Sequence, residues 1–232
     1  MCIRDRYWDD WKRCVRNRDY PLGFHAGSFY GWARNWMGIE NISVLFYDNP
    51  HLVHAVIDHL TDFLCTTLEK AVSEVSFDFA LIFEDLGMKT GPLLSPDLFR
   101  EFCLPGYRKF TAFLRSHGVE TIFVDSDGNN DPIMPLWKEG GVNGMLPLEA
   151  AAGNNVVEMA DRHGRDFAFM GNIDKRALRL TKKDVEKELM AKLPAMWEKG
   201  GYLPFLDHQI PPDIPLENFR YAVELIHRFT RL

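Results

Sequence analysis

Short apolar runs alternate with longer amphipathic stretches over most of this 232-residue chain, and this alternation limits the possible folds more than any other feature. In His51–Val75, for example, a preceding proline and apolar residues at every third or fourth position predict a long helix. Strands joined by such helices run parallel, because each crossover covers one face of the sheet. Six strands are expected, over Leu22–Ala26, Phe77–Glu84, Thr121–Val124, Gly144–Leu146, Phe167–Met170 and Tyr202–Leu206.

Polar side chains follow the predicted strands at their carboxyl ends. They are Glu84 and Asp85, Asp125 and Asp127, Glu149, Asn172 and Asp174, and Asp207 with His208. A (β/α)8 TIM barrel gathers its active site at this end of its strands. A doubly wound sheet does so too, but its Gly-rich phosphate fingerprint is missing after every strand. We therefore expect an α/β TIM barrel that is incomplete at the N-terminus, with about six of its eight strands present.

No linker or break in composition divides the chain, so residues 1–232 are interpreted as a single barrel domain. Its first 20 residues are polar and rich in arginine, and we expect a non-native or disordered start there. Missing strands would leave unpaired sheet edges, so a homodimer formed through an edge is also expected.

Charge and cysteine content indicate in which compartment the protein occurs and which classes of partner it can bind. A net charge of −6 disfavours nucleic acid as a partner, since a phosphate-binding face shows a basic excess. The four cysteines lie far apart and form no CxxC pair, as in a protein with reduced thiols. No apolar run approaches a signal peptide or the roughly 20 residues of a membrane span. The sequence thus predicts a cytoplasmic protein that acts on a small molecule.

Catalytic candidates lie among the polar residues at the strand ends. His208 could donate a proton, hold a substrate carboxylate or bind a metal; capping or core packing is the alternative. Asp125 and Asp127 point to the same side of an extended chain and could hold a cation, or else they form an Asx turn with Gly128. Glu84 and Asp85 are also catalytic candidates, with a structural network between strand ends as the alternative. Asp125, Asp127 and His208 together are candidate ligands for zinc or another divalent metal.

Four further residues are candidates for binding the substrate. Asn172 and Asp174 follow a strand, although a helix cap explains Asp174 equally well. Trp32 belongs to an aromatic cluster that could stack on a ligand or pack in the core. Arg34 is one of few cations near the strand ends.

Several motifs occur together and in order from about Gly23 to the C-terminus. They are EDLGMKTGPLLSPDLF at 84–99, LPGYR at 104–108, DGN at 127–129, EGGVNG at 139–144, GNIDKRAL at 171–178, and GGYLP followed by DH and PP within 200–212. In these motifs the chain resembles the uroporphyrinogen decarboxylase family, whose superfamily includes cobalamin-dependent methyltransferases. The resemblance implies a single TIM barrel of about 340 residues or more.

The resemblance carries over to individual residues only in part. His208 matches the active-site histidine of the decarboxylases, but Asp85 stands where they have a serine, and no tyrosine is in register near Trp32–Arg34. The N-terminal arginines and aspartate with which decarboxylases hold their substrate cannot be located. In the methyltransferases a His-x-Cys pair and a later Cys bind zinc, and these positions correspond to Asp125, Asp127 and His208.

Three functions follow from this resemblance. The one we prefer is a methyltransferase-like enzyme that passes a methyl group from a small substrate to a corrinoid on a partner protein, with zinc or another divalent metal at the site. The second is a uroporphyrinogen decarboxylase of porphyrin biosynthesis, which works by acid–base chemistry without a cofactor. The third is an inactive barrel fragment. The acidic residues at the strand ends argue against a polycarboxylate macrocycle as substrate.

Overall fold

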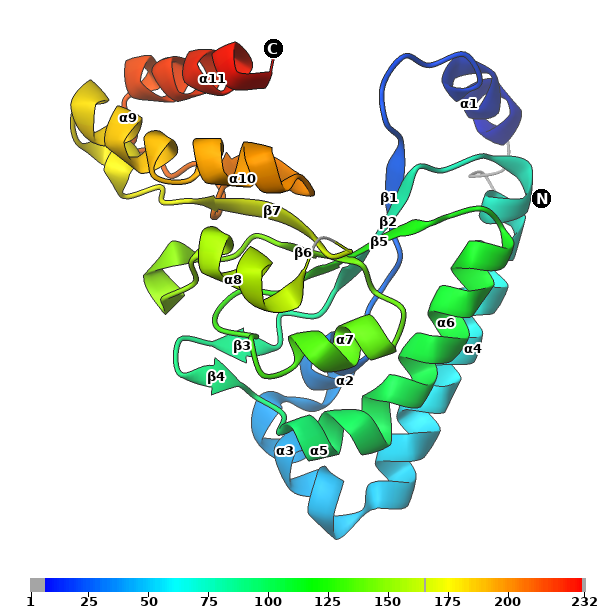
Figure 1. Ribbon diagram of the computed structural model, residues 1–232. Helices are drawn as coiled ribbons and strands as arrows, with labels where there is room; N and C mark the ends of the chain where they lie inside the picture. Colours follow the sequence, from blue (N-terminus) through cyan, green and yellow to red (C-terminus); the bar gives the residue numbers. More distant parts are fainter. Residues whose placement is uncertain (1–6, 165, 231–232) are drawn as a thin grey trace.

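Six parallel strands form the central sheet of the computed structural model, which describes residues 7–164 and 166–230 (Figure 1). Each strand pairs with the one that precedes it in the sheet order, so the order follows the chain. The strands are β1 (Gly23–His25), β2 (Phe79–Phe83), β5 (Thr121–Asp125), β6 (Gly144–Leu146), β7 (Ala168–Ile173) and β8 (Tyr202–Leu206). This is the arrangement of a partial TIM barrel, as predicted, and all six predicted strands are present.

Helices connect the strands and cover one face of the sheet (Figure 1). Among the described residues they are α1 (Trp8–Val15), α2 (Tyr30–Met37), α3 (Ile39–Asp48), α4 (Pro50–Glu74), α5 (Pro96–Leu98), α6 (Leu104–Ser116), α7 (Met134–Glu139), α8 (Val156–His163), α9 (Lys182–Met190), α10 (Leu193–Lys199) and α11 (Leu216–Thr230). The side chain of Asn49 caps α4 by accepting a hydrogen bond from the Leu52 amide at 3.2 Å, with Pro50 in the first turn. In residues 7–164 and 166–230, no helix combines the length and apolarity that crossing a membrane requires.

Two elements were not expected from the sequence. Helix α3 directly follows α2, after Gly38 adopts a φ of 83°. A short antiparallel hairpin, β3 (Gly87–Met88) with β4 (Gly91–Pro92), follows β2 at its carboxyl end. The hairpin packs closely on the loop after β5. A Cβ atom added to Gly87 would lie only 2.2 Å from the carbonyl oxygen of Asp127, so this position has no room for a side chain.

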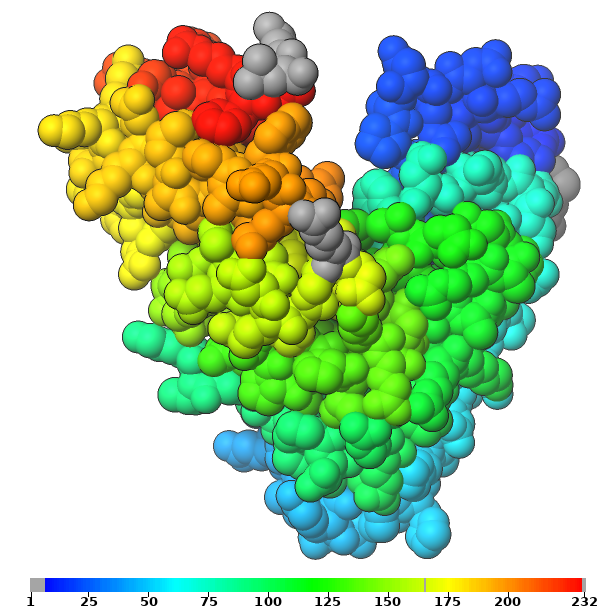
Figure 2. Space-filling view, in the orientation of Figure 1, coloured from blue at the N-terminus to red at the C-terminus, as the bar shows by residue number. Residues whose placement is uncertain are grey.

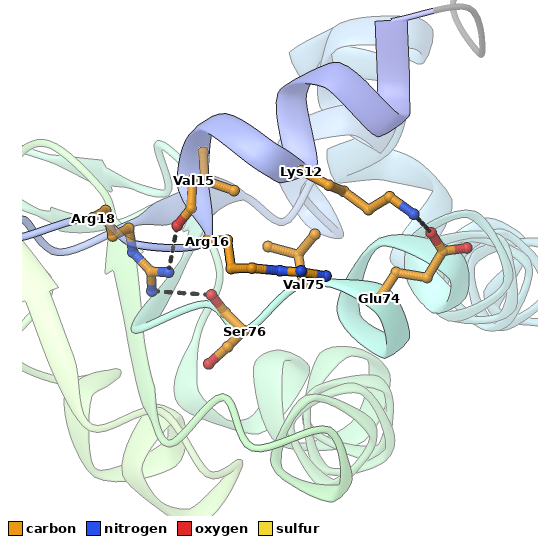
Figure 3. Close-up of a pocket in the computed structure, with 7 residues that line it drawn as sticks. All are labelled: Lys12, Val15, Arg16, Arg18, Glu74, Val75 and Ser76. Atoms are coloured by element: carbon orange, nitrogen blue, oxygen red, sulfur yellow. Dashed lines mark hydrogen bonds and ion pairs between the residues drawn. The ribbon is translucent and has the colours of Figure 1, made fainter.

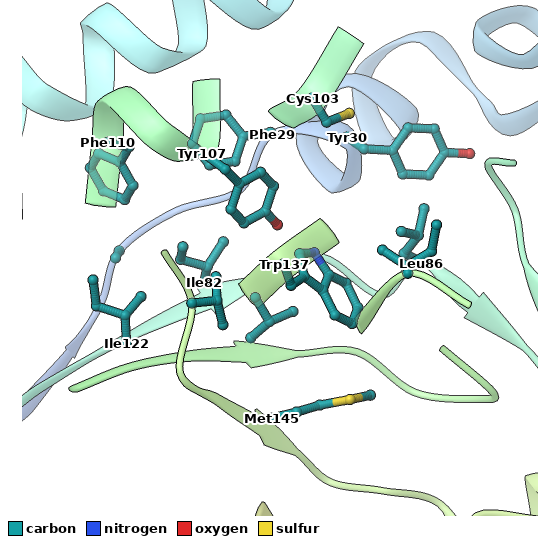
Figure 4. Packing of buried hydrophobic residues seen from close by; sticks show 14 of the residues in the cluster. Phe29, Tyr30, Ile82, Leu86, Cys103, Tyr107, Phe110, Ile122, Trp137 and Met145 are labelled. Atoms are coloured by element: carbon teal, nitrogen blue, oxygen red, sulfur yellow. The ribbon is translucent and has the colours of Figure 1, made fainter. Parts of the chain in front are cut away.

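The helix-covered face of the sheet is the core of the molecule. Ala80 and Ile82 of β2 pair in register with Ile122 and Val124 of β5, and all four side chains are buried. Aromatic side chains from α6 and α7 cover them, among them Tyr107, Phe110 and Trp137 (Figure 4). Parallel sheets are normally buried in this way under their crossover helices.

The opposite face, which would line the interior of a closed barrel, carries exposed apolar side chains. Phe83 of β2 is 42% exposed, and Leu203 and Phe205 of β8 are 47% and 50% exposed. Among the described strands, β1 and β8 are the two edges of the sheet. In the space-filling view a notch separates α1 from α10 and α11, which lie toward opposite edges (Figure 2).

A helix lies within the segment for which a non-native or disordered start was predicted. Residues 1–6 are outside the described part, and residues 8–15 form helix α1. Val15 is buried in the core, and Lys12 forms an ion pair of 2.6 Å with Glu74 at the end of α4. Arg18 forms a second ion pair, 2.7 Å long, with Asp78 just before β2. These contacts fix α1 against the body of the sheet.

Candidate functional site

Ionisable side chains from neighbouring strand ends gather at one place, which we call the mouth. Nε2 of His208 lies 3.6 Å from Oδ2 of Asp127. Nζ of Lys175 lies 3.8 Å from Oε1 of Glu149. The pKa of Asp127 responds to the charges of these groups and of Asp85, so all of them lie close enough to influence Asp127. The mouth consists of Asp85, Asp125, Asp127, Glu149, Lys175 and His208, which follow or end β2, β5, β6, β7 and β8.

Burial, assisted by like charges, makes Asp125 and Asp127 weaker acids than usual. Burial and, to a smaller extent, the charges of Asp127 and Asp85 together raise the pKa of Asp125 to about 6, with His208 acting in the opposite direction. The pKa of Asp127 is also raised, chiefly by burial, with His208 acting in the opposite direction. Asp125 is therefore divided between its protonated and ionised forms close to neutral pH.

The imidazole of His208 is oriented by its own backbone neighbour. The amide of Gln209 donates a hydrogen bond of 2.8 Å to Nδ1 of His208. Since Nδ1 accepts, the neutral ring carries its proton on Nε2, the nitrogen that faces Asp127. The mouth thus presents an N–H donor beside a carboxylate.

Arg34 is held by Asp85. Its guanidinium donates to Oδ2 of Asp85 at 3.0 Å and also to the carbonyl oxygen of the same residue. Asp85 has a φ of 49°, a left-handed conformation that is unusual for a residue other than glycine. Arg34 was expected to bind substrate, but the structure gives it an intramolecular partner that keeps this strand end in place.

Glu84 does not belong to the mouth, and its catalytic role stays a prediction. Its side chain is buried, with 1% of the residue exposed. One oxygen accepts from the Phe29 amide at 2.9 Å and the Tyr107 hydroxyl at 2.8 Å, and the other accepts from the Gly31 amide at 2.9 Å. Burial raises the pKa of Glu84 while these hydrogen bonds lower it. The carboxylate holds the start of α2, which is the structural network that was the alternative.

Asn172 and Asp174 are likewise engaged within the protein rather than free for a ligand. Asn172 is fully buried, accepts from the Val156 amide at 2.9 Å and donates to the Leu148 carbonyl at 2.8 Å. Asp174 accepts from the amide and the guanidinium of Arg176. Burial alone would raise the pKa of Asp174, but the hydrogen bonds from Arg176 outweigh it and lower the pKa. The substrate-binding role of Asn172 stays a prediction, and Asp174 makes local contacts like those of a cap.

Trp32 packs against the hydrophobic core, and its ring is tilted by 30° relative to that of Trp36, with ring centroids 5.8 Å apart. This favours the core interpretation. The sequence pattern assigns no role to Glu149 and Lys175, although the structure places both at the mouth. The available signal was their position, since each follows a strand.

The predicted metal ligands do not form a metal centre in this arrangement. In the described part of the chain, no group of three His, Cys, Asp or Glu side chains is placed to hold a metal ion. Asp125, Asp127 and His208 are brought together, but as mutually interacting acid–base groups. Zinc therefore enters none of the steps derived below.

A cavity of about 480 Å³ lies away from the mouth, between α1 and the end of α4 (Figure 3). Its charged lining is mostly paired: Lys12 donates to Glu74, and Arg18 donates to the carbonyls of Val15 and Ser76 (Figure 3). With these cations engaged, the cavity is not the candidate active site.

Comparison with known proteins agrees with the fold and the motifs. The family model described as uroporphyrinogen decarboxylase (URO-D) matches residues 15–229. The chain belongs to the uroporphyrinogen decarboxylase family. It is 25% identical over 226 residues to the uroporphyrinogen decarboxylase of an Anaeromyxobacter species, covering 94% of this chain and 61% of that protein. It is 27% identical over 195 residues to that of a Nitratiruptor species, covering 82% and 53%.

A solved structure has a similar fold. A methyltransferase from Methanosarcina mazei superposes with a TM-score of 0.70 at 19% identity, covering 94% of this chain and 61% of that one. The chain thus spans between about half and three-fifths of the length of these relatives. The family and its barrel architecture are shown, whereas these identities leave the reaction open.

Proposed function

We propose that this chain belongs to a methyltransferase-like member of the family, which transfers a methyl group from a small neutral or cationic donor to a corrinoid carried by a partner protein. One observation carries the proposal: the mouth is acidic. Four carboxylates, from Asp85, Asp125, Asp127 and Glu149, lie there, and the cations that the described residues place beside them are Lys175 and the Asp85-bound Arg34. With His208 neutral, the mouth and Arg34 together have a formal charge of −2.

This charge disfavours a substrate with many carboxylates. A porphyrinogen with acidic side chains would meet four carboxylates and only two cations that are each already beside one of them. Like charges held a few ångströms apart in a partly buried site repel strongly. A neutral ether or a protonated amine meets no such repulsion.

Methyl transfer requires a proton at the leaving group. When the bond between the methyl carbon and the donor's oxygen breaks, the methyl group passes to the acceptor and the oxygen takes up a proton. Asp125, with a pKa of about 6, is the group at the mouth that can supply it, and the Nε2–H of His208 can donate a hydrogen bond beside it. A general acid works best when its pKa is near the working pH. The corrinoid, when bound on its partner, would supply the methyl acceptor.

Uroporphyrinogen decarboxylation is the second candidate, because the curated relatives carry that name. It requires the same kind of proton donor and no cofactor, so the acid–base groups of the mouth suit it as well. The two proposals differ in the charge of the substrate. The substrate assay therefore separates them better than any further consideration of the catalytic groups.

The decisive experiment incubates the purified chain with reduced cobalamin and a panel of methoxylated aromatics, methanol and methylamines, and follows methylcobalamin by its absorbance. A parallel assay measures coproporphyrinogen formed from uroporphyrinogen. Methylcobalamin formation that falls about 10²–10⁴-fold in Asp125→Asn supports the proposal. The matched control, Asp131→Asn, changes a carboxylate that is paired with His163 at 2.8 Å and should keep activity. Coproporphyrinogen without methylcobalamin would favour the decarboxylase, and neither product would favour an inactive fragment.

A further inference from the structure

A fully buried carboxylate lies beside His208 and links three strand ends. Asp207, directly after β8, has none of its surface exposed. Its Oδ2 accepts a hydrogen bond of 3.0 Å from the Ala150 amide, in the loop after β6. Its Oδ1 accepts one of 3.1 Å from the Lys175 amide, in the loop after β7. Its own amide donates to the Ile173 carbonyl at 2.9 Å.

Both residues whose amides contact the Asp207 side chain either belong to the mouth or are next to one of its members in the sequence. Ala150 follows Glu149, Lys175 is itself at the mouth, and His208 follows Asp207. We propose that Asp207 is a positioning residue, which fixes Glu149, Lys175 and His208 relative to one another and to Asp127. The proposal rests on the proposed function only in taking the mouth as the reacting site.

The chemistry of the partners explains why this position carries an aspartate. Both partners of the Asp207 side chain are N–H donors, so two acceptor oxygens are needed. Asn172, one strand away, is the natural comparison: it accepts from the Val156 amide but donates to the Leu148 and Asn154 carbonyls, which only an amide can do. An amide at position 207 would direct its NH2 group at a backbone N–H and leave that donor unpaired in the interior. A buried unpaired donor is costly.

The test uses the full 232-residue chain and requires no substrate. Amide hydrogen exchange is measured by NMR in the wild type, in Asp207→Asn and in the control Asp174→Asn, which alters an aspartate paired locally with Arg176. In Asp207→Asn the amides of Ala150 and Lys175 should exchange at least about tenfold faster. The Val156 amide, held by Asn172, should be unchanged and serves as an internal control.

A second readout separates positioning from a merely structural role. The nuclear Overhauser effect between the His208 ring and the Asp127 β-protons, whose side chains approach to 3.6 Å, should disappear in Asp207→Asn and persist in Asp174→Asn. Faster exchange with this signal intact would overturn the proposal, because Asp207 would then stabilise the loops without placing His208.

If Asp207→Asn fails to fold, amide exchange in the wild-type protein still tests the proposal. Both the Ala150 and the Lys175 amides must be protected in the wild type, since a buried carboxylate holds them. If either exchanges as freely as an amide in an unstructured loop, the proposal falls. Neither readout depends on turnover, so a failed substrate assay would overturn the proposed function and leave the positioning role standing.

Discussion

Replacing Asp125 by asparagine should stabilise the protein at neutral and alkaline pH. The pKa of Asp125 is about 6, against 3.8 for an ordinary aspartate, because burial and the charges of Asp127 and Asp85 disfavour the ionised form. A difference of one in pKa corresponds to about 1.4 kcal/mol, so ionisation costs the folded state at most about 3 kcal/mol. Asp125 is only partly buried, and allowing for solvent screening we expect about 1–2 kcal/mol.

The sign of the effect follows from linkage. Below pH 3.8 Asp125 is protonated in the folded and the unfolded chain, and the wild type has no penalty there. As the pH rises toward 6 the unfolded chain loses its proton first, so folding becomes progressively less favourable. Above pH 6 the penalty is complete. Asparagine is neutral throughout and has nearly the same shape, so its advantage should appear between about pH 4 and 6 and stay constant above.

Thermal and urea unfolding at pH 5, 6.5 and 8 measure this directly. At pH 8 the melting temperature of Asp125→Asn should exceed that of the wild type by roughly 2–8 °C, given about 2–4 °C for each kcal/mol in a chain of this size. The difference should shrink at pH 5. Asp58→Asn, which changes an exposed carboxylate on α4, is the control and should show neither effect. A variant no more stable than the wild type at pH 8, or an advantage independent of pH, would refute the reasoning.

Three further outcomes are expected. Glu84→Gln should lower the free energy of unfolding by about 1–3 kcal/mol in urea titrations at pH 7, because its amide group would face the N–H and O–H donors that the carboxylate accepts; unchanged stability would contradict the role in holding α2. The 232-residue chain should self-associate in sedimentation velocity experiments, because Leu203 and Phe205 are exposed at an edge strand; a monodisperse monomer at about 100 µM would count against this. Elemental analysis should find zinc well below one per chain, since no three side chains of the described residues form a site for it; stoichiometric zinc that Asp127→Ala and His208→Ala both lose would restore the metal-dependent mechanism.

The sheet could be predicted because its signals are local and repeated. Each strand is a short apolar run, and each crossover has a helical period, so all six strands appear within a few residues of their expected positions. Helix α3 was missed because its boundary depends on the positive φ of Gly38, and the β3–β4 hairpin was missed because its strands are two residues long. Neither feature produces a periodic pattern.

Some residues of the mouth were predicted from the sequence. Which predicted residues reach the mouth depends on the face of the sheet toward which each side chain points. Side chains alternate along a strand. Phe83 faces the open side, so Glu84 points toward the helices and Asp85 toward the mouth. On β5, Asp125 and Asp127 face the mouth, while Ser126 between them is buried and accepts from the Leu86 amide at 2.8 Å. The sequence identified which strand ends carry polar residues, but treating Glu84 and Asp85 as equivalent ignored this alternation.

The alternation of side chains between the two faces breaks down at the carboxyl ends of β7 and β8, and the physical reason is backbone conformation. Asn172 pairs in register with Phe205, which faces the open side, yet its amide is buried at the start of α8. Gly171 and Asn172 have φ values of 112° and 63°, which rotate the chain out of the strand geometry. Asp207 likewise follows the last strand residue, Leu206, and turns inward. No sequence period reports such turns, so only the structure separates the buried polar residues from those at the mouth.

The buried residues and the mouth are two halves of one arrangement. Burial chiefly, and repulsion from Asp127 and Asp85 in addition, raise the pKa of Asp125, so ionising it costs free energy in the folded protein. Loops that carried these acids freely would move apart and relieve the repulsion. Glu84 and Asp207 prevent this, because each accepts backbone donors from neighbouring loops inside the protein. A weak acid near neutral pH therefore depends on carboxylates that never contact a substrate, and changing either buried group should alter the mouth without removing any of its members.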